Sequence, residues 1–212
     1  MQDFFVTGTD TEIGKTYVTC CLLRDLRRRG FSAMGYKPMA CGDRADARAM
    51  RDATDPTASL ELINPLYLRA ATAPYVAAQL QNAVISLESL LQGYRVLQGA
   101  GFSPILVEGA GGWEVPIAPG LSMSDFAVEL GLPVILVVGN KLGAVNHTVL
   151  TVQAIRARGL ECRAIVLNHA GESWDTAALT NKALIEEFTG LPVRAELIHG
   201  QEDLDSLSVL GV

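Results

Sequence analysis

Short apolar runs alternate with longer segments of helical period along most of this 212-residue chain. Apolar runs bounded by turn residues predict buried strands, and an apolar position every three or four residues predicts a helix. The expected strands cover residues 4–6, 31–36, 105–107, 133–138, 164–167 and 193–198, and the expected helices cover 14–29, 46–53, 86–97, 146–158 and 174–188. This alternation predicts an α/β protein with a mostly parallel sheet and helices on both faces.

The first predicted helix has the clearest pattern, because Val18, Leu22 and Leu26 recur every four residues and Gly30 follows as a terminator. No internal repeat, low-complexity tract or linker interrupts the chain. With 49% apolar and 19% charged residues, it can fill a substantial core. We therefore expect one domain that spans residues 1–212.

Charge and composition exclude several kinds of partner. The formal net charge of -6 argues against nucleic acid, and the arginines between residues 24 and 29 are interpreted as a solvated helix end. The first residues lack a signal peptide pattern, and the longest apolar run, 132–138, is too short to cross a bilayer. None of the four cysteines forms a C-x-x-C pair, so a reducing compartment is the simplest fit and we expect a cytoplasmic protein without a membrane partner.

The chemically unusual residues follow the predicted strands directly. They lie in the segments 9–16, 37–42, 108–113 and 140–146, and at Asn168. Because parallel strands end at the same edge of a sheet, and open α/β sheets bind ligands there, one edge is expected to carry the chemistry.

The segment Gly8-Thr9-Asp10-Thr11-Glu12-Ile13-Gly14-Lys15-Thr16 has the setting of a phosphate-binding loop, since it follows a strand and opens a helix. Backbone N–H groups at a helix start suit a phosphate, Lys15 can reach the β- and γ-phosphates, and Thr16 can offer a hydroxyl to Mg²⁺. The loop has five residues between Gly8 and Gly14 where four are usual. We favour nucleotide binding over a chance strand–turn–helix corner because the structural setting is right.

Glu12 is unusual in such a loop, because its carboxylate repels the anion that the loop surrounds. Two interpretations stay open: Glu12 complements the helix N-terminus, or it faces a cationic amine on a second substrate. Lys37, before Pro38, is either a surface residue or, as we favour, a second cation for a transferred phosphoryl group.

Glu108 ends an apolar strand, which is the usual setting of a carboxylate that holds a metal or orders water in P-loop enzymes. The glycines after it, in Gly109–Gly112, let the backbone approach a ligand closely. Asp46 is a weaker candidate, since Asp43 and Asp46 can each be a plain helix cap. By spacing, His147, His169 and His199 are not a metal site, and we interpret them as structural or peripheral.

Four segments, GTDTEIGKT, GYKPMACG, VEGAGGW and LPVILVVGNKLGAVNH, resemble the dethiobiotin synthetase family in order and spacing, over about Phe5 to Asn168. The resemblance implies a P-loop NTPase-type fold. It also implies a late step of biotin synthesis, in which 7,8-diaminopelargonate, CO₂ and ATP give dethiobiotin, ADP and phosphate. One amine would form a carbamate, the carbamate would take the γ-phosphoryl group, and the second amine would close the ring.

The resemblance also implies roles for individual residues. It makes Lys37, Lys15 and Thr11 catalytic, and Thr16, Asp46 and Glu108 ligands of Mg²⁺. It implies ATP contacts for Glu12, Ile13, Gly14, Lys15, Thr16, Tyr17, Asp46, Glu108, Gly109, Ala110, Gly111, Asn168, His169, Ile198, His199 and Gly200. It implies substrate contacts for Glu12, Lys37, Cys41, Gly111 and Asn146, of which Asn146 would act across the interface of a homodimer.

Two other functions compete with this one. The first is another amide-forming ATPase of the same superfamily. Such enzymes usually carry a glutaminase domain, for which this chain has no room, though a separate subunit could supply it. The second is a ParA- or MinD-like ATPase switch, which normally has a second lysine early in its phosphate loop. Residues 9–12 of this chain contain no lysine, so we favour the synthetase.

Overall fold

A six-stranded sheet forms the centre of the protein, whose computed structural model describes residues 1–171 and 176–212. The strand order is β10-β9-β8-β1-β5-β2, and every pairing in this sheet is parallel. The strands are β1 (Phe4–Gly8), β2 (Met34–Tyr36), β5 (Ile105–Glu108), β8 (Val134–Gly139), β9 (Cys162–Asn168) and β10 (Val193–Leu197). The predicted α/β class with a mostly parallel sheet is confirmed.

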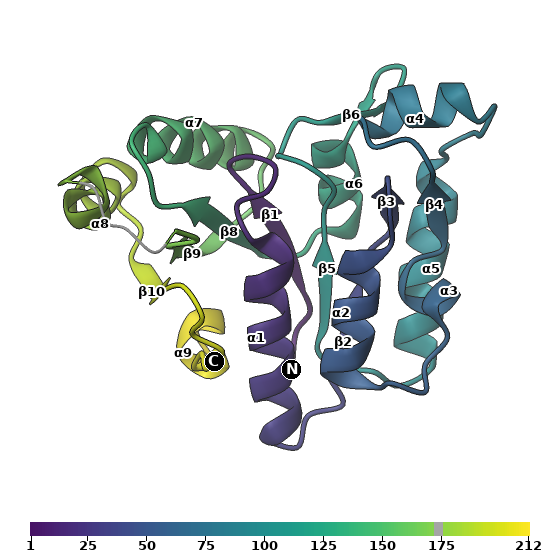
Figure 1. Ribbon diagram of the computed structural model, residues 1–212, viewed down its shortest axis with the longest axis horizontal. Helices are drawn as coiled ribbons and strands as arrows, with labels where there is room; N and C mark the ends of the chain where they lie inside the picture. The colour runs from purple at the N-terminus through teal and green to yellow at the C-terminus, as the bar shows by residue number, and fades with distance from the viewer. Residues whose placement is uncertain (172–175) are drawn as a thin grey trace.

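Helices cover both faces of this sheet, as predicted. Figure 1 shows α1 and α2 in front of the strands and α5 and α6 behind them. Contacts join α1 to α2 and α9, α5 to α6, and α7 to α8. Their bounds are α1 Lys15–Arg28, α2 Ala45–Thr54, α5 Leu87–Gly99, α6 Met123–Leu130, α7 Ala144–Ala157, α8 Thr176–Thr189 and α9 Ser206–Leu210. The middle strands are buried because they are covered on both sides, which explains their unbroken apolar runs.

Smaller elements build a wall over the carboxyl edge of the sheet. The strands β3 (Met39–Cys41) and β4 (Leu66–Leu68) pair in parallel, with α3 (Leu60–Ile63) before β4 and α4 (Pro74–Leu80) after it. A short hairpin of β6 (Pro116–Ala118) and β7 (Leu121–Ser122) contacts α4. Figure 1 places β3, α4 and β6 on the same side of the molecule as the loop between β1 and α1.

The short elements β3, β4, β6, β7, α3, α4 and α9 were not predicted, and the structure differs from the predicted elements at other places too. The strand predicted over 31–36 is shorter, because Phe31 N still bonds Leu26 O at the end of α1 and Ser32 forms only an isolated bridge to Ser103. Helix α6, which Ser122 and Asp125 start with a capping box, was not predicted. The late helix was predicted from Trp174, which lies outside the described residues, and α8 begins at Thr176.

A buried carboxylate fastens the end of the chain to α1. Asp25 Oδ2 accepts hydrogen bonds from the backbone N and the Oγ of Ser206, at 2.9 and 2.7 Å, and from Arg29 Nε at 2.7 Å. Burial would raise the pKa of Asp25, but the bonds from Ser206 and Arg29 outweigh it and lower that pKa. The arginines at this end of α1 are exposed, as expected of a solvated helix end.

Two further expectations can be compared with the structure. The cysteines of α1, Cys20 and Cys21, are free and buried as small apolar residues. In the described ranges, the helices are too short or too polar for any of them to cross a bilayer.

Candidate active site

The loop between β1 and α1 has the backbone of a phosphate cradle. Gly14 caps α1 with a φ of 85°, and a Cβ there would lie 2.1 Å from Asn168 Nδ2, so this position requires glycine. Glu12 also has a positive φ, 57°, which is an unfavourable conformation for a residue with a side chain. Such strain is concentrated at functional sites, where the surrounding structure holds it.

Lys15 folds back over its own loop. Its Nζ donates to the carbonyl of Asp10 at 2.8 Å, and the side chain is buried. Burial and the positive charge of Lys37 together lower the pKa of Lys15 to about 8, although the carboxylates of Glu108, Asp46 and Asp10 act in the opposite direction. An anion bound beside the Lys15 ammonium would raise this pKa back toward its ordinary value.

Glu108 joins three side chains at the end of β5. Its Oε1 accepts hydrogen bonds from Thr16 Oγ1 and from Lys37 Nζ, each at 2.7 Å, and its Oε2 accepts one from Thr19 Oγ1 at 2.7 Å. The side chain has no exposed surface. The register places Glu108 beside Val6 of β1, so the carboxylate lies directly below the phosphate loop.

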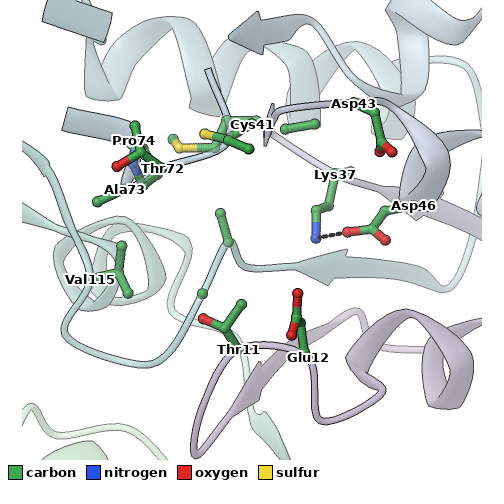
Figure 2. A pocket seen from close by; sticks show the side chains of 15 residues that line it. Thr11, Glu12, Lys37, Cys41, Asp43, Asp46, Thr72, Ala73, Pro74 and Val115 are labelled. Atoms are coloured by element: carbon green, nitrogen blue, oxygen red, sulfur yellow. Dashed lines mark ion pairs between the residues drawn. The ribbon is translucent and has the colours of Figure 1, made fainter. Parts of the chain in front are cut away.

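Lys37 lies between two carboxylates. Its Nζ is 2.7 Å from Glu108 Oε1 and 2.7 Å from Asp46 Oδ2, the ion pair drawn in Figure 2. Burial would lower the pKa of Lys37, but the two carboxylates outweigh it and raise that pKa. The backbone is fixed as well, because Lys37 N donates to Ile63 O and Asn64 Nδ2 donates to Lys37 O, both at 2.8 Å.

The two aspartates of the 43–46 segment differ in their contacts. Asp46 faces the site: burial would raise its pKa, but the positive charge of Lys37 and the hydrogen bond from its ammonium outweigh burial and lower that pKa. Asp43 Oδ1 instead accepts from the backbone N of Ala45 at 2.8 Å, as a residue at a helix start does. The structure therefore groups Asp46 with Thr16, Lys37 and Glu108.

Two adjoining cavities share this floor. One, of about 650 Å³, is lined by Lys15, Thr16 and Glu108, and the other, of about 490 Å³, by Met39, Pro74 and Val115. Both are lined by Thr11, Glu12, Lys37, Cys41, Asp43, Asp46, Ala71 and Gly111. Figure 2 shows Glu12 and Lys37 pointing into the cavity from opposite walls. The arrangement offers one charged compartment and one partly apolar compartment with common walls.

A third cavity, of about 710 Å³, lies on the other side of the phosphate loop and is lined by Ile13, Asn140, Lys141 and Asn168, among others. Asn168 Nδ2 donates to the carbonyl of Ile13 at 2.9 Å. Because a carbonyl only accepts hydrogen bonds, this contact fixes the orientation of the amide and leaves Asn168 Oδ1 as an acceptor.

Several residues that the sequence analysis placed at the site lie apart from these cavities. His169 is buried and its Nε2 is 2.9 Å from Asn140 Nδ2. Ile198, His199 and Gly200 form an exposed turn after β10, and Asn146 is exposed on the first turn of α7. Tyr17 turns its hydroxyl to the carbonyl of Gln201. None of these six residues lines the three cavities described above.

Thr19 and Arg69 are among the residues of the site that were not found from the sequence. Thr19 had a signal, since it lies three residues after Thr16 and therefore on the same face of the helix. Arg69 is an exposed residue directly after β4 that lines the larger of the two adjoining cavities. No local pattern marked it, because β4 has only three residues and was not predicted.

Comparison with known proteins first defines the class. A family model described as an AAA domain matches residues 2–204. The fold is similar to that of the MinD cell division protein of Aquifex aeolicus, with a TM-score of 0.60 and 14% identity over 95% of this chain and 84% of that chain. A ParA family ATPase from Chlorobium tepidum TLS gives a TM-score of 0.57 and 14% identity, over 93% of this chain and 84% of that one. The fold and the phosphate loop define a P-loop nucleoside triphosphatase.

Sequence comparison then gives the family. The chain is 52% identical over 205 residues to the ATP-dependent dethiobiotin synthetase of Akkermansia muciniphila, covering 97% of this chain and 96% of that protein. It is 43% identical over 203 residues to the enzyme of the same name from Anaeromyxobacter sp., covering 94% and 91%. The chain belongs to the ATP-dependent dethiobiotin synthetase family, as its motifs predicted. The similarity to MinD and ParA concerns the fold alone.

Proposed function

We propose that the protein uses ATP and Mg²⁺ to convert 7,8-diaminopelargonate and CO₂ to dethiobiotin, ADP and phosphate. The observation that carries this proposal is the contact of Lys37 Nζ with both Glu108 and Asp46 at 2.7 Å, on the floor of a cleft that the phosphate loop borders. Membership of the dethiobiotin synthetase family supplies the reaction. The residues supply the charges that this reaction needs.

Thr16, Asp46 and Glu108 would hold the Mg²⁺. The described residues contain no cluster of three His, Cys, Asp or Glu side chains that could hold a metal by itself. Mg²⁺ does not need one, since it commonly uses one or two carboxylates and completes its shell with water and phosphate oxygens. The Lys37 ammonium is a stand-in for a cation between these oxygens. When bound, the ion would neutralise charge on the β- and γ-phosphates.

The two lysines would act on the transferred group. Lys15 would exchange the carbonyl of Asp10 for phosphate oxygens. Lys37 would leave the carboxylates as the metal takes over their neutralisation, and its flexible stem would bring the ammonium to the carbamate and the γ-phosphate. Thr11, which lines both adjoining cavities, would help to hold the phosphate.

The smaller cavity suits the diamine. Val115, Pro74 and Met39 offer an apolar lining for its carbon chain, and Cys41 lines the same cavity. Glu12 lines this cavity, which favours the interpretation of Glu12 as the partner of a cationic amine. The third cavity would take the base of the nucleotide, and Asn168 there would present its oxygen to a base with an exocyclic amine, as adenine has.

We also propose a homodimer in which Asn146 contacts substrate bound to the other subunit. The first turn of α7 is exposed, and the large apolar side chains around it and on α8 are bare: Leu142 is 80% exposed, Leu150 57% and Leu179 68%. We take these side chains as parts of one apolar patch, and such a patch often marks an interface with a partner. A second copy would cover it and bring Asn146 to a cleft that it does not line in its own chain.

The test is the dependence of phosphate release on substrates. The proposal expects release that requires both the diamine and bicarbonate, produces dethiobiotin in equal amount, and is unaffected by glutamine, DNA or lipid vesicles. Release that DNA or lipid stimulates without the diamine would contradict the proposal and favour an ATPase switch. Dependence on glutamine would favour an amide-forming relative.

A further inference from the structure

We infer that Thr19 is a positioning residue that fixes the carboxylate of Glu108, so that one defined oxygen faces Thr16, Lys37 and the proposed metal. This inference rests on the proposed function, because it takes Glu108 as a metal ligand. Thr19 and Thr16 lie one turn apart on the same face of α1, and each donates to a different oxygen of Glu108. The helix that carries the phosphate loop thus also sets the orientation of the acid on β5.

The division of the two oxygens is the central observation. Oε1 of Glu108 accepts from Thr16 and Lys37, and Oε2 accepts from Thr19 at 2.7 Å. Within the described chain, Thr19 is the one hydrogen-bond donor to Oε2, and both side chains have no exposed surface. The torsion that turns a glutamate carboxylate is only weakly restrained by itself. Without the hydroxyl of Thr19, the buried carboxylate would turn to find another donor and move Oε1 away from Thr16.

A helix threonine has a simpler use for its hydroxyl, which must be distinguished from this role. Thr19 Oγ1 is also 2.9 Å from the carbonyl of Lys15, four residues earlier. Threonines within helices commonly donate to that carbonyl. However, a hydroxyl has one proton, and a carboxylate is a stronger acceptor than a carbonyl. The bond to Glu108 is therefore the one that we expect to matter for metal binding.

The experiment measures the binding of the ATP analogue AMP-PNP by calorimetry, with and without Mg²⁺. Thr19→Val and Thr19→Ala remove the hydroxyl, and Thr19→Ser keeps it. For both hydroxyl-free variants we expect the Mg²⁺-dependent gain in affinity to fall by about tenfold or more, as expected for one lost bond to a charged group. Affinity without Mg²⁺ should stay unchanged, and Thr19→Ser should behave like the unaltered protein.

Thr54→Val provides the matched control. Thr54 is also a buried helix threonine, on α2, and its Oγ1 donates to the carbonyl of Met50 at 2.8 Å without touching a carboxylate. We expect this variant to keep the full Mg²⁺-dependent gain. Equal losses with and without Mg²⁺, an equal loss in Thr54→Val, or a Thr19→Ser variant as impaired as Thr19→Val would each overturn the inference.

The binding measurement also separates this inference from the proposed function. Unaltered protein that binds the analogue with Mg²⁺ but makes no dethiobiotin would contradict the proposed function. The Mg²⁺-dependent gain in affinity of the Thr19 variants would still test whether Thr19 positions Glu108. Unaltered protein whose affinity for the analogue ignores Mg²⁺ would overturn the inference. In turnover assays, the Mg²⁺ concentration for half-maximal rate should rise in Thr19→Val, with the KM for the diamine unchanged.

Discussion

At the scale of single residues, the cleft buries an ammonium and a carboxylate that pair with each other. Lys37 and Glu108 are both buried, and each is satisfied by the other and by a small set of hydroxyl and carboxylate neighbours. Removing one partner of a buried ion pair leaves an uncompensated charge, which is expensive in the interior. Substitutions of Lys37 or Glu108 should therefore change both the turnover rate and the affinity for a metal ion.

Lys37→Gln should lower turnover by at least about 10²-fold, the loss typical of one donor that stabilises transition-state charge. The circular dichroism spectrum should stay that of a folded protein. The same variant should bind Mn²⁺ more tightly than the unaltered protein when no nucleotide is present, because the cation that competes for Asp46 and Glu108 is gone. Electron paramagnetic resonance of free Mn²⁺ measures this affinity.

Lys141→Gln is the control for that variant, since Lys141 is an exposed lysine beside the phosphate loop whose Nζ is 3.7 Å from Asp10 Oδ2. Its Mn²⁺ affinity should match that of the unaltered protein. Near-normal dethiobiotin production by Lys37→Gln would remove Lys37 from the mechanism. Weaker Mn²⁺ binding in that variant would exclude the stand-in role.

Glu12→Gln should raise the KM for the diamine more than the KM for ATP, because the carboxylate that faces the smaller cavity loses its charge. Steady-state kinetics with each substrate varied in turn measures both constants. A loss of about 1.5–3 kcal/mol is expected for one hydrogen bond to a charged group, which corresponds to roughly 10–100-fold in the diamine constant. Equal changes in both constants would favour the interpretation of Glu12 as a plain helix-start residue.

Nucleotide binding should take up a proton above about pH 8. Burial and Lys37 depress the pKa of Lys15 to about 8, so the free protein loses this charge as the pH rises through that value, whereas a bound phosphate favours the charged form. Calorimetry in buffers of different ionisation enthalpy measures the uptake. Proton uptake should vanish well below pH 8, where Lys15 is already protonated in the free protein. Identical binding heats in all buffers above that pH would refute the lowered pKa of Lys15.

At the scale of elements, α5 is seated on β2 through a glycine. A Cβ at Gly93 would lie 2.2 Å from the hydroxyl of Tyr36, which donates to Leu90 O. Gly93→Ala should therefore destabilise the protein by about 1–3 kcal/mol through overpacking, although alanine is the better helix former. Gly99→Ala, at the open end of the same helix, places its Cβ within 4 Å of no atom beyond its chain neighbours and its own helix backbone, and should be neutral or slightly stabilising. Chemical denaturation measures the free energy of unfolding of both variants. Equal values for the two would show that α5 can shift to make room for the added methyl group.

The elements also explain which parts of the fold could be predicted from sequence. The strand before the phosphate loop was found because it is an apolar run bounded by a Gly-rich turn. The helix after it was found because it is long enough to display its period, as Val18, Leu22 and Leu26 do. The wall over the cleft was missed because β3 and β4 have three residues each and, among the residues that the structure describes, pair only with each other. The eight residues of α6 were too few for a period, although its capping box was visible at Ser122 and Asp125.

The residues of the candidate site also divide into those that the sequence predicts and those that depend on the folded structure. Lys15, Thr16 and Glu108 were predictable because each stands beside a recognisable strand end or loop. The choice of Asp46 over Asp43 depends on the contact between α2 and Lys37, and the placement of Arg69 depends on the β3–β4 pairing. Those are long-range contacts that local sequence does not specify. The turn at 198–200 was placed by resemblance alone, and in the structure it lies apart from the cleft.

At the scale of the whole molecule, the exposed apolar side chains near α7 predict association. Leu150→Glu should shift the protein from dimer to monomer, because a charge would have to be buried in the interface. Light scattering after gel filtration measures the mass. Val84→Glu is the control, because Val84 is 88% exposed in the loop between α4 and α5 and is not part of the proposed interface. A monomeric unaltered protein would contradict the proposed homodimer.

The shared walls of the adjoining cavities have a consequence for inhibitor chemistry. Thr11 and Glu12 border the compartments proposed for the triphosphate and for the diamine, so ligands for the two lie on either side of a single loop. A molecule that joins a phosphate mimic to an aminoalkyl chain would need only a short tether to fill both. Tethering makes the second binding event intramolecular, at an effective concentration of roughly millimolar for a short flexible link. Selectivity over other nucleotide-binding proteins would then come from the aminoalkyl half.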